Sequence, residues 1–510
     1  MKRFISAFCL ALGVCAYAQE SKLGHIEFPT SGSAPAQLHF VQGVLLLHSF
    51  EYSDAREEFQ AASKIEPHFA MAYWGEALTY THPIWMQQDV TAARAALARL
   101  APTPDARLAL APTEREKDYL HGVELLYGEG DKVSRDKAYA NALERMMKKY
   151  PDDLEAASLY AVALLGTCQY ERQAAVYMRA AAVAEEVFAK NPQHPGAIHY
   201  LIHAYDDPIH APLGLRPARV YGKVAGSASH AQHMPSHIFF ALGMWDEAIS
   251  ANEASVAVAD ERVKRKGLDP SERNYHSLLW LEYAYLQEGR VADARQVLSG
   301  IQLPRQRSIM RATYATETGD WDSSPSDLDL SHGNLLDKVA VLTAEGLGHV
   351  AHGRLEEARS CAVNLKKEID SSSGNEGVAN HGSMPMAGPP NTQKLVAIMR
   401  QQLEGALLYA EGKGDKAFAL LSQSASEEDA LNFEFGPPMP LKPTHELYGE
   451  LLLKAGRARE AGREFESVLQ RTPGRAIALR CLAKARTEAG DRDGAAETLA
   501  QLGAFWRGER

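Results

Sequence analysis

The residues with the clearest chemical potential in this sequence are histidines. Seven of the 19 histidines lie in the segment from His194 to His237. In this segment His199 and His203 are four residues apart, and His233 is likewise four residues before His237. Residues with that spacing project from the same face of a helix. Each pair therefore has the geometry of a two-imidazole clip for a metal ion.

The two pairs are separated by a constant distance along the chain. The interval from His199 to His233 equals the interval from His203 to His237. If this 34-residue interval is the length of a structural repeat, both pairs occupy equivalent positions on adjacent stacked helices, about 8–10 Å apart. The spacing therefore predicts that the four imidazoles converge on one patch.

Three further polar residues are candidates for the same patch. Asp206 lies one helical turn beyond His203, and His230 and His276 share the second place of their respective repeat units. Carboxylates and imidazoles either bind metals directly or orient the residues that do. We therefore interpret Asp206, His230 and His276 as additional metal ligands or as groups that orient the ligands.

A transition metal is our leading interpretation of this histidine-rich patch. Imidazoles suit zinc, copper, iron or nickel. Four histidines with a nearby aspartate exceed the needs of one catalytic zinc, so the pattern allows a dinuclear site. Thioethers from Met234, Met384 or Met386 would favour copper, although packing is the simpler role for these methionines. Two alternatives stay open: a metal-free site for an anionic ligand or peptide, and a structural polar network.

The helices that would carry these residues are predicted by a 34-residue repeat. Counting from Ala36, small or aromatic residues occupy the places where two antiparallel helices cross closely, and a proline ends the second helix. The same frame recurs from Lys442 and, less completely, from Tyr275, Val339 and Ala476. In the two clearest units these residues are Gly43, Ala55, Phe59, Ala62 and Pro67, and Gly449, Gly456, Ala461, Phe465 and Pro473.

This pattern resembles the tetratricopeptide repeat (TPR) family. The resemblance covers most of residues 36–500. It implies an all-α solenoid of helix-turn-helix units, wound as a right-handed superhelix with a concave groove. In the family the first helix of each unit lines that groove. The resemblance therefore implies that both histidine pairs face the groove.

The composition and the repeats divide the chain into five parts. We expect a signal peptide at 1–18, an N-terminal array with the histidine-rich groove at 19–300, and further repeat-like helices at 301–370. Residues 371–392 are rich in Gly, Ser and Pro and lack a helical period, which predicts a long loop. A C-terminal array at 393–510 completes the chain.

The segment 1–18 has the pattern of a secretory signal peptide. Lys2 and Arg3 are followed by an apolar stretch and by a small residue on either side of Tyr17, before the expected cleavage site. We therefore expect an exported protein, periplasmic or secreted. Lipid attachment at Cys15 is the less favoured alternative.

The overall composition excludes several classes of protein. The formal net charge is −11 and no basic stripe offsets it, which argues against nucleic-acid binding. No apolar run reaches the roughly 20 residues of a transmembrane segment. Phosphate-binding loops, dinucleotide fingerprints, G-x-S-x-G and HExxH are all absent, so we expect no nucleotide cofactor. The three cysteines beyond the signal peptide are too few for a disulfide framework.

The motifs HYLIH and HAQHMPSHIF are similar to those of a subset of secreted bacterial TPR proteins. The resemblance implies a scaffold that binds a protein, a peptide or a small molecule in its groove, and it assigns no reaction. Our leading hypothesis is such a scaffold with a metal site at the histidine pairs. A metal-dependent hydrolase or oxidoreductase, with Asp206 or Glu76 as general base, is one alternative. A metal-free peptide-binding module is the other.

Overall fold

The chain is almost entirely α-helical in the computed structural model. The structure describes residues 22–168, 171–321, 333–372, 389–432 and 436–508. The predicted signal peptide lies outside these residues. Two short strands, β1 (Thr81–His82) and β2 (Gln87–Gln88), pair antiparallel around the 3-10 helix η1 (Pro83–Trp85). The predicted all-α class is confirmed.

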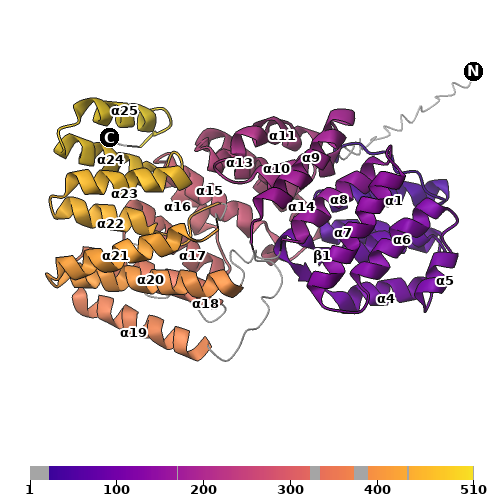
Figure 1. Cartoon of the computed structure of the whole chain (residues 1–510), viewed down its shortest axis with the longest axis horizontal. Coiled ribbons are helices and arrows are strands. Elements are labelled where there is room, and N and C mark those ends of the chain that lie inside the picture. Colours follow the sequence, from indigo (N-terminus) through magenta and orange to yellow (C-terminus); the bar gives the residue numbers. More distant parts are fainter. Residues whose placement is uncertain (1–21, 169–170, 322–332, 373–388, 433–435, 509–510) are drawn as a thin grey trace, which may run out of the picture.

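The N-terminal helices stack in sequence order at one end of the molecule (Figure 1). Many of them begin at an aspartate or threonine whose side chain accepts a backbone N–H, as Asp153 does for Ala156. These helices are α1 (Ala34–His48), α2 (Tyr52–Ile65), α3 (Ala70–Leu78), α4 (Val90–Leu100), α5 (Pro104–Ala109), α6 (Glu114–Leu126), α7 (Lys132–Lys149), α8 (Leu154–Gly166) and α9 (Ala174–Lys190).

The next helices lead from the middle of the molecule, where α10, α11, α13 and α14 lie, toward the C-terminal end, where α16 and α17 lie (Figure 1). They are α10 (Pro195–Tyr205), α11 (Ala211–Val224), α12 (Ser229–His233), α13 (Pro235–Ala241), α14 (Trp245–Lys266), the 3-10 helix η2 (Pro270–Glu272), α15 (Tyr275–Gln287), α16 (Val291–Ser299) and α17 (Pro304–Thr318). All of the histidines that the sequence singled out belong to this central part.

The C-terminal helices continue the stack. They are α18 (Leu335–Ala351), α19 (Leu355–Ser372), α20 (Pro389–Ala410), α21 (Gly414–Asp429), α22 (Thr444–Lys454), α23 (Ala458–Arg471), α24 (Ala476–Glu488) and α25 (Arg492–Gly503). In the described part of the chain, no helix combines the length and apolar character that a membrane crossing requires.

Both ends of the segment expected as a loop are helical. We expected a loop over 371–392, but α19 extends to Ser372 and α20 begins at Pro389. Prolines are compatible with the first turn of a helix. The Pro-rich composition therefore led us to expect a loop where the first turn of α20 lies. Residues 373–388 lie outside the described part of the chain.

The 34-residue frame corresponds to close helix packing. A Cβ atom at Gly43 would lie 2.7 Å from the ring of Phe59, and one at Gly449 would lie 2.8 Å from the ring of Phe465. In both units the glycine at the eighth place therefore lies against the aromatic ring at the twenty-fourth place. The small residue is required because the two helices leave no room for a side chain. The helix-turn-helix repeat arrangement is confirmed.

A buried arginine ties the last repeats to the centre of the chain. Arg475 is 0% exposed and donates from Nε and Nη2 to the carboxylate of Glu446, at 2.6 and 2.9 Å. Its Nη1 donates to Glu317 at 2.8 Å and to the hydroxyl of Tyr283 at 2.7 Å. Glu317 and Tyr283 precede Arg475 by 158 and 192 residues. The guanidinium therefore joins helices α15, α17, α22 and the start of α24.

The substitution Gly75→Ala tests the repeat packing. An added Cβ would meet the ring of Phe59, which is 0% exposed and cannot move aside freely. Overpacking of this kind costs about 1–3 kcal/mol, so we expect a lower midpoint of thermal unfolding by circular dichroism. At Gly503 an added Cβ meets nothing within 4 Å, so Gly503→Ala should not lower the midpoint. Equal midpoints for the two variants would contradict the packing.

The substitution Arg475→Met tests the buried ion pairs. It leaves Glu317 without its cation and leaves Glu446 with Lys442 alone. Removing one partner from a buried ion pair costs about 3–5 kcal/mol, so we expect a large fall in the free energy of unfolding by denaturant titration. The exposed Arg459 provides a matched control, Arg459→Met, which should change that free energy by about 0.5 kcal/mol or less.

Candidate metal centre

Helix α10 carries the first histidine pair. His194 caps this helix, because its Nδ1 accepts a hydrogen bond from the amide of Ala197 at 3.2 Å. Pro195 occupies the first turn, where a backbone N–H has no partner within the helix, so the absence of this group costs no hydrogen bond. His199 and His203 then project from one face of the helix, with ring centroids 4.8 Å apart. The four-residue spacing therefore has the geometry that the sequence predicts.

The second pair spans a break between two helices. His233 ends α12, and Pro235 begins α13 with no N–H to continue the ladder of hydrogen bonds. His237 lies inside α13. The Nε2 atoms of His233 and His237 nevertheless face each other at 3.1 Å. The pair thus forms across the proline break, since residues on both sides of Pro235 keep helical backbone angles.

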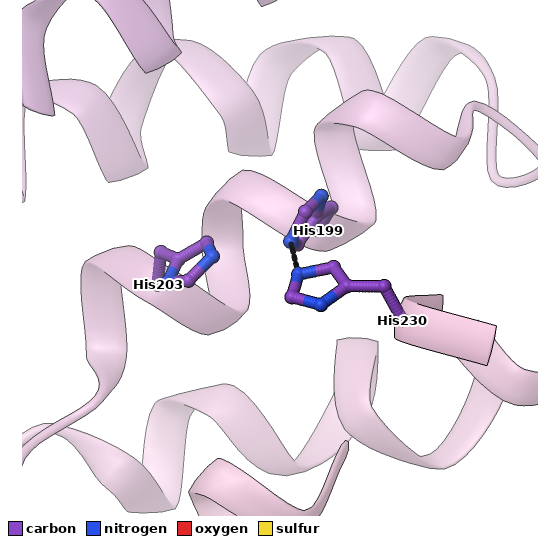
Figure 2. Close-up of side chains that lie close together, drawn as sticks. All are labelled: His199, His203 and His230. Carbon is purple, nitrogen blue, oxygen red and sulfur yellow. Dashed lines mark hydrogen bonds between the residues drawn. The ribbon is translucent and has the colours of Figure 1, made fainter. Parts of the chain in front are cut away.

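One further histidine joins each pair. In each resulting set of three, one side-chain nitrogen per residue lies within 4.8 Å of the others. Figure 2 shows His199 and His203 on one helix and His230 reaching toward them from another. We name the two sets the first triad (His199, His203 and His230) and the second triad (His233, His237 and His276).

The two triads adjoin each other. The ring centroids of His203 and His237 are 5.9 Å apart, and those of His230 and His233 are 6.2 Å apart. The six imidazoles therefore form one continuous patch. His230 and His276 are the partly exposed members, one in each triad.

The histidine pairs are enclosed, whereas we expected them to line an open groove. The four histidines of the pairs are at most 4% exposed. The ring of Phe50 covers His199 at a centroid distance of 4.3 Å, and the ring of Trp280 lies 4.5 Å from that of His237. Side chains from the α1–α2 turn and from α15 thus close over the patch. The repeat frame alone could not predict this cover.

Hydrogen bonds determine which nitrogen of each buried ring carries the proton. His199 Nδ1 lies 2.7 Å from the backbone carbonyl oxygen of His48, which can only accept. His233 Nδ1 lies 2.7 Å from Asn252 Oδ1. The Asn252 amide nitrogen donates to the carbonyl of Ala248 at 2.8 Å, which identifies Oδ1 as the acceptor. In both rings Nδ1 therefore carries the proton, and Nε2 presents a lone pair to its triad.

Asp206 orients a histidine from behind. Its Oδ2 accepts a hydrogen bond from His237 Nδ1 at 2.6 Å, and both residues are buried. This carboxylate–imidazole arrangement is typical of metal-binding histidines, in which the carboxylate sets the tautomer and raises the basicity of the ligand nitrogen. Asp206 therefore contacts the ring of His237, while its Oδ1 has no hydrogen-bond partner among the described residues, and both roles that the sequence allowed for Asp206 stay predictions.

The second triad contains two lone pairs that face each other. Because His233 and His237 both donate from Nδ1, both of their Nε2 atoms are acceptors in the neutral rings. Two acceptors at 3.1 Å repel unless a cation lies between them. Two nitrogens that bind one tetrahedral metal at 2.0–2.1 Å are about 3.3 Å apart. The observed separation is therefore close to that of two ligands of one metal ion.

A proton on the His233 ring is a poor candidate for that cation. Burial, followed by the charges of neighbouring imidazoles, holds the pKa of every histidine of the first triad well below the ordinary value. The same causes lower the pKa of His233, and burial followed by His237 lowers the pKa of His276 to about 3. Neutral imidazoles are the form that binds transition metals.

Each triad also holds a nitrogen with no hydrogen bond. Among the described residues, the buried Nε2 atoms of His203 and His276 have no hydrogen-bond partner. An unsatisfied buried polar atom costs about 1–3 kcal/mol. A metal ion bound by each triad would satisfy both atoms, and the all-imidazole donor set fits copper, zinc or iron.

A third cluster, which the sequence analysis missed, supports the first triad. Glu155 Oε2 lies 2.7 Å from His48 Nε2, and Oε1 lies 3.0 Å from His194 Nε2. Because His194 Nδ1 accepts from a backbone amide, its proton is on Nε2. Burial opposes ionisation of Glu155, but the two imidazoles overcome it and hold its pKa well below the usual range. The hydrogen bond between His48 and Glu155 thus fixes the side chain of the residue whose carbonyl oxygen accepts from His199.

Comparisons with known proteins add little to this geometry. No protein-family model matches the sequence. No curated protein matches it. Solved structures with similar folds include the TPR domain of P58(IPK), at 14% identity over 90% of this chain and 99% of that chain, with a TM-score of 0.22. The human IFIT1 dimer with m7Gppp-AAAA is 13% identical over 94% of this chain and 91% of that chain, with a TM-score of 0.31. Ypp1 is 8% identical over 92% of this chain and 88% of that chain, with a TM-score of 0.41.

At these TM-scores the likenesses carry no argument about what the chain binds. Its own helices and side chains define its class: an all-α helical-repeat protein with a cluster of six histidines at its centre, four of them buried.

The substitution Asp206→Asn tests the orienting role of this carboxylate. Loss of the charge behind His237 lowers the basicity of its Nε2, and such changes weaken metal binding by about 10- to 100-fold. We expect that loss in a competition titration of the metal-free protein against a chromophoric chelator. The exposed Asp152 offers the control Asp152→Asn, which should bind metal as the wild type does. Unchanged affinity for Asp206→Asn would show that the carboxylate plays no part.

Proposed function

We propose that this protein is a helical-repeat scaffold that holds two transition-metal ions, one in each triad. The observation that carries the proposal is the facing pair of Nε2 atoms in His233 and His237, 3.1 Å apart, each with its proton committed to a buried acceptor on the other side of the ring. The unpartnered nitrogens of His203 and His276 support it independently in each triad.

Copper is the metal that the donor set favours over zinc and iron. Six imidazoles surround the centre, and Asp206 is the one carboxylate hydrogen-bonded to the ring of a triad histidine among the described residues, whereas Glu51 accepts from the backbone N–H of His230 at 3.0 Å. Two divalent ions would bring four positive charges to this enclosed centre, whereas two cuprous ions would bring two. Uncompensated buried charge is costly, and imidazole is a good ligand for copper. Met384 and Met386, considered as thioether ligands, lie outside the described residues.

The proposal includes a location outside the cytoplasm, which is supported by the pattern of residues 1–18 alone. It also includes a protein, peptide or small-molecule ligand for the helical scaffold, since repeat solenoids present extended surfaces for binding. In this proposal the metal centre is the part of the scaffold that has a defined chemistry.

A redox role for the same centre is the second candidate. Two adjoining three-histidine sets place two metal ions close enough to act together on one small molecule. A hydrolase is less well supported, because both proposed general bases are engaged. Asp206 accepts from His237, and the buried Glu76 is paired with Arg99 and accepts from Gln60. The metal-free peptide module is weakened by the burial of the histidine pairs, which no peptide could contact directly.

Metal content by elemental mass spectrometry tests the proposal. We expect about two equivalents of metal in the untagged protein and almost none in a His199→Ala/His237→Ala double variant, because each triad loses one of three ligands. The exposed His68 and His121 provide the control double variant His68→Ala/His121→Ala, which should keep both equivalents. Helical circular dichroism must be retained in each.

The stoichiometry tests the assignment of one ion to each triad. His203→Ala alone should lose about one equivalent, and so should His276→Ala, because the two residues belong to different triads. A wild-type protein that stays metal-free after incubation with copper, zinc and iron would contradict the proposal.

A further inference from the structure

We infer that an apolar pocket beside the first triad binds a small, neutral phenol and presents it to the metal centre. The binding site is argued from the pocket itself, and its connection to the metal rests on the proposed function. The pocket leaves about 50 Å³ accessible to the centre of a water molecule, and it opens partly to solvent. Its walls are largely aliphatic and include Leu47, Leu78, Leu126, Leu159, Val162 and Ala163.

Two aromatic rings form the wall between this pocket and the first triad. Phe50 and Tyr200 both line the pocket. The ring of Phe50 lies 4.3 Å from that of His199 and 5.5 Å from that of His230, measured between centroids. The ring of Tyr200 lies 5.5 Å from that of His199. A molecule in the pocket is thus separated from the triad by a single layer of side chains.

The backbone at this wall is strained. Phe50 has a φ of 55°, in the left-handed region that non-glycine residues rarely adopt. The other such non-glycine residue in the described part of the chain is Met86, which ends η1, and Pro83 of η1 also lines the pocket. Strained residues gather at ligand sites and at positions that switch conformation. The strained residue Phe50 therefore lies in the wall that separates the pocket from the first triad.

The polar groups of the pocket indicate a neutral ligand with one hydroxyl. Tyr52 lines the pocket, and its buried hydroxyl has no hydrogen-bond partner among the described residues. Burial raises its pKa well above the ordinary tyrosine value, so it remains an O–H group. The one charged pair in the lining, Lys132 and Asp136, is internally neutralised. An aromatic ring suits the aliphatic walls, and a phenolic hydroxyl suits Tyr52.

Ligand-observed NMR with phenol and toluene, on the metal-free protein, tests the pocket. We expect wild-type protein to bind both probes and Ala163→Phe, which fills the pocket, to bind neither. Ala175→Phe, an identical substitution at an exposed position, should bind both. Tyr52→Phe should weaken phenol binding by about fivefold and leave toluene binding unchanged, because it removes only one hydrogen bond.

The outcomes separate this inference from the proposed function. Phenol binding that survives Ala163→Phe in a folded protein, or that Tyr52→Phe leaves unaltered, would overturn the pocket assignment whatever the metal content. A protein that binds two metal ions but no phenol would retain the proposed function and lose this inference. Binding of phenol with the expected variant pattern to a protein that takes up no metal would support the pocket and overturn its connection to the triad.

Discussion

Three hydrogen bonds determine the direction in which the buried imidazoles point. The acceptors are a backbone carbonyl at His48, an amide at Asn252 and a carboxylate at Asp206, and none can exchange its role with the ring that it faces. Each acceptor therefore binds the Nδ1–H of its histidine and leaves Nε2 directed toward the triad to which that histidine belongs. Without these acceptors the rings could turn or exchange tautomers, and the triads would lose their preorganisation.

These acceptors come from distant parts of the chain, so the site depends on the stacking of the whole array. The His48 carbonyl ends α1, Asn252 lies on α14, and α15 supplies both His276 and the covering Trp280. Helix α15 is in turn held by Arg475 of the C-terminal repeats through Tyr283. The repeats thus act as the rigid support of a central site, because a displaced helix would separate an acceptor from its ring.

The repeat arrangement and the pairing of the histidines could be predicted from the sequence because both follow local periodicities. Gly43 and Phe59 lie on the two helices of one hairpin, and the histidine pairs recur at the length of one repeat. The loop boundaries at Ser372 and Pro389 were less predictable, since Gly, Ser and Pro are also tolerated at helix ends. Asn252 was overlooked because an asparagine within a helix carries no distinguishing spacing.

The sequence by itself determined the helix class, the helical face on which each histidine pair lies and the one-repeat relation between the pairs. Helical geometry and repeat length are short-range properties, so the residues alone specify them. Only the tertiary structure decided that His230 joins one histidine pair and His276 the other, which gives two triads. It also decided that Phe50 and Trp280 cover the cluster, and which atoms accept hydrogen bonds from the imidazole rings. The bond from His199 to the His48 carbonyl joins residues 151 positions apart. Contacts at that separation follow no sequence period, because they arise from the way whole helices stack.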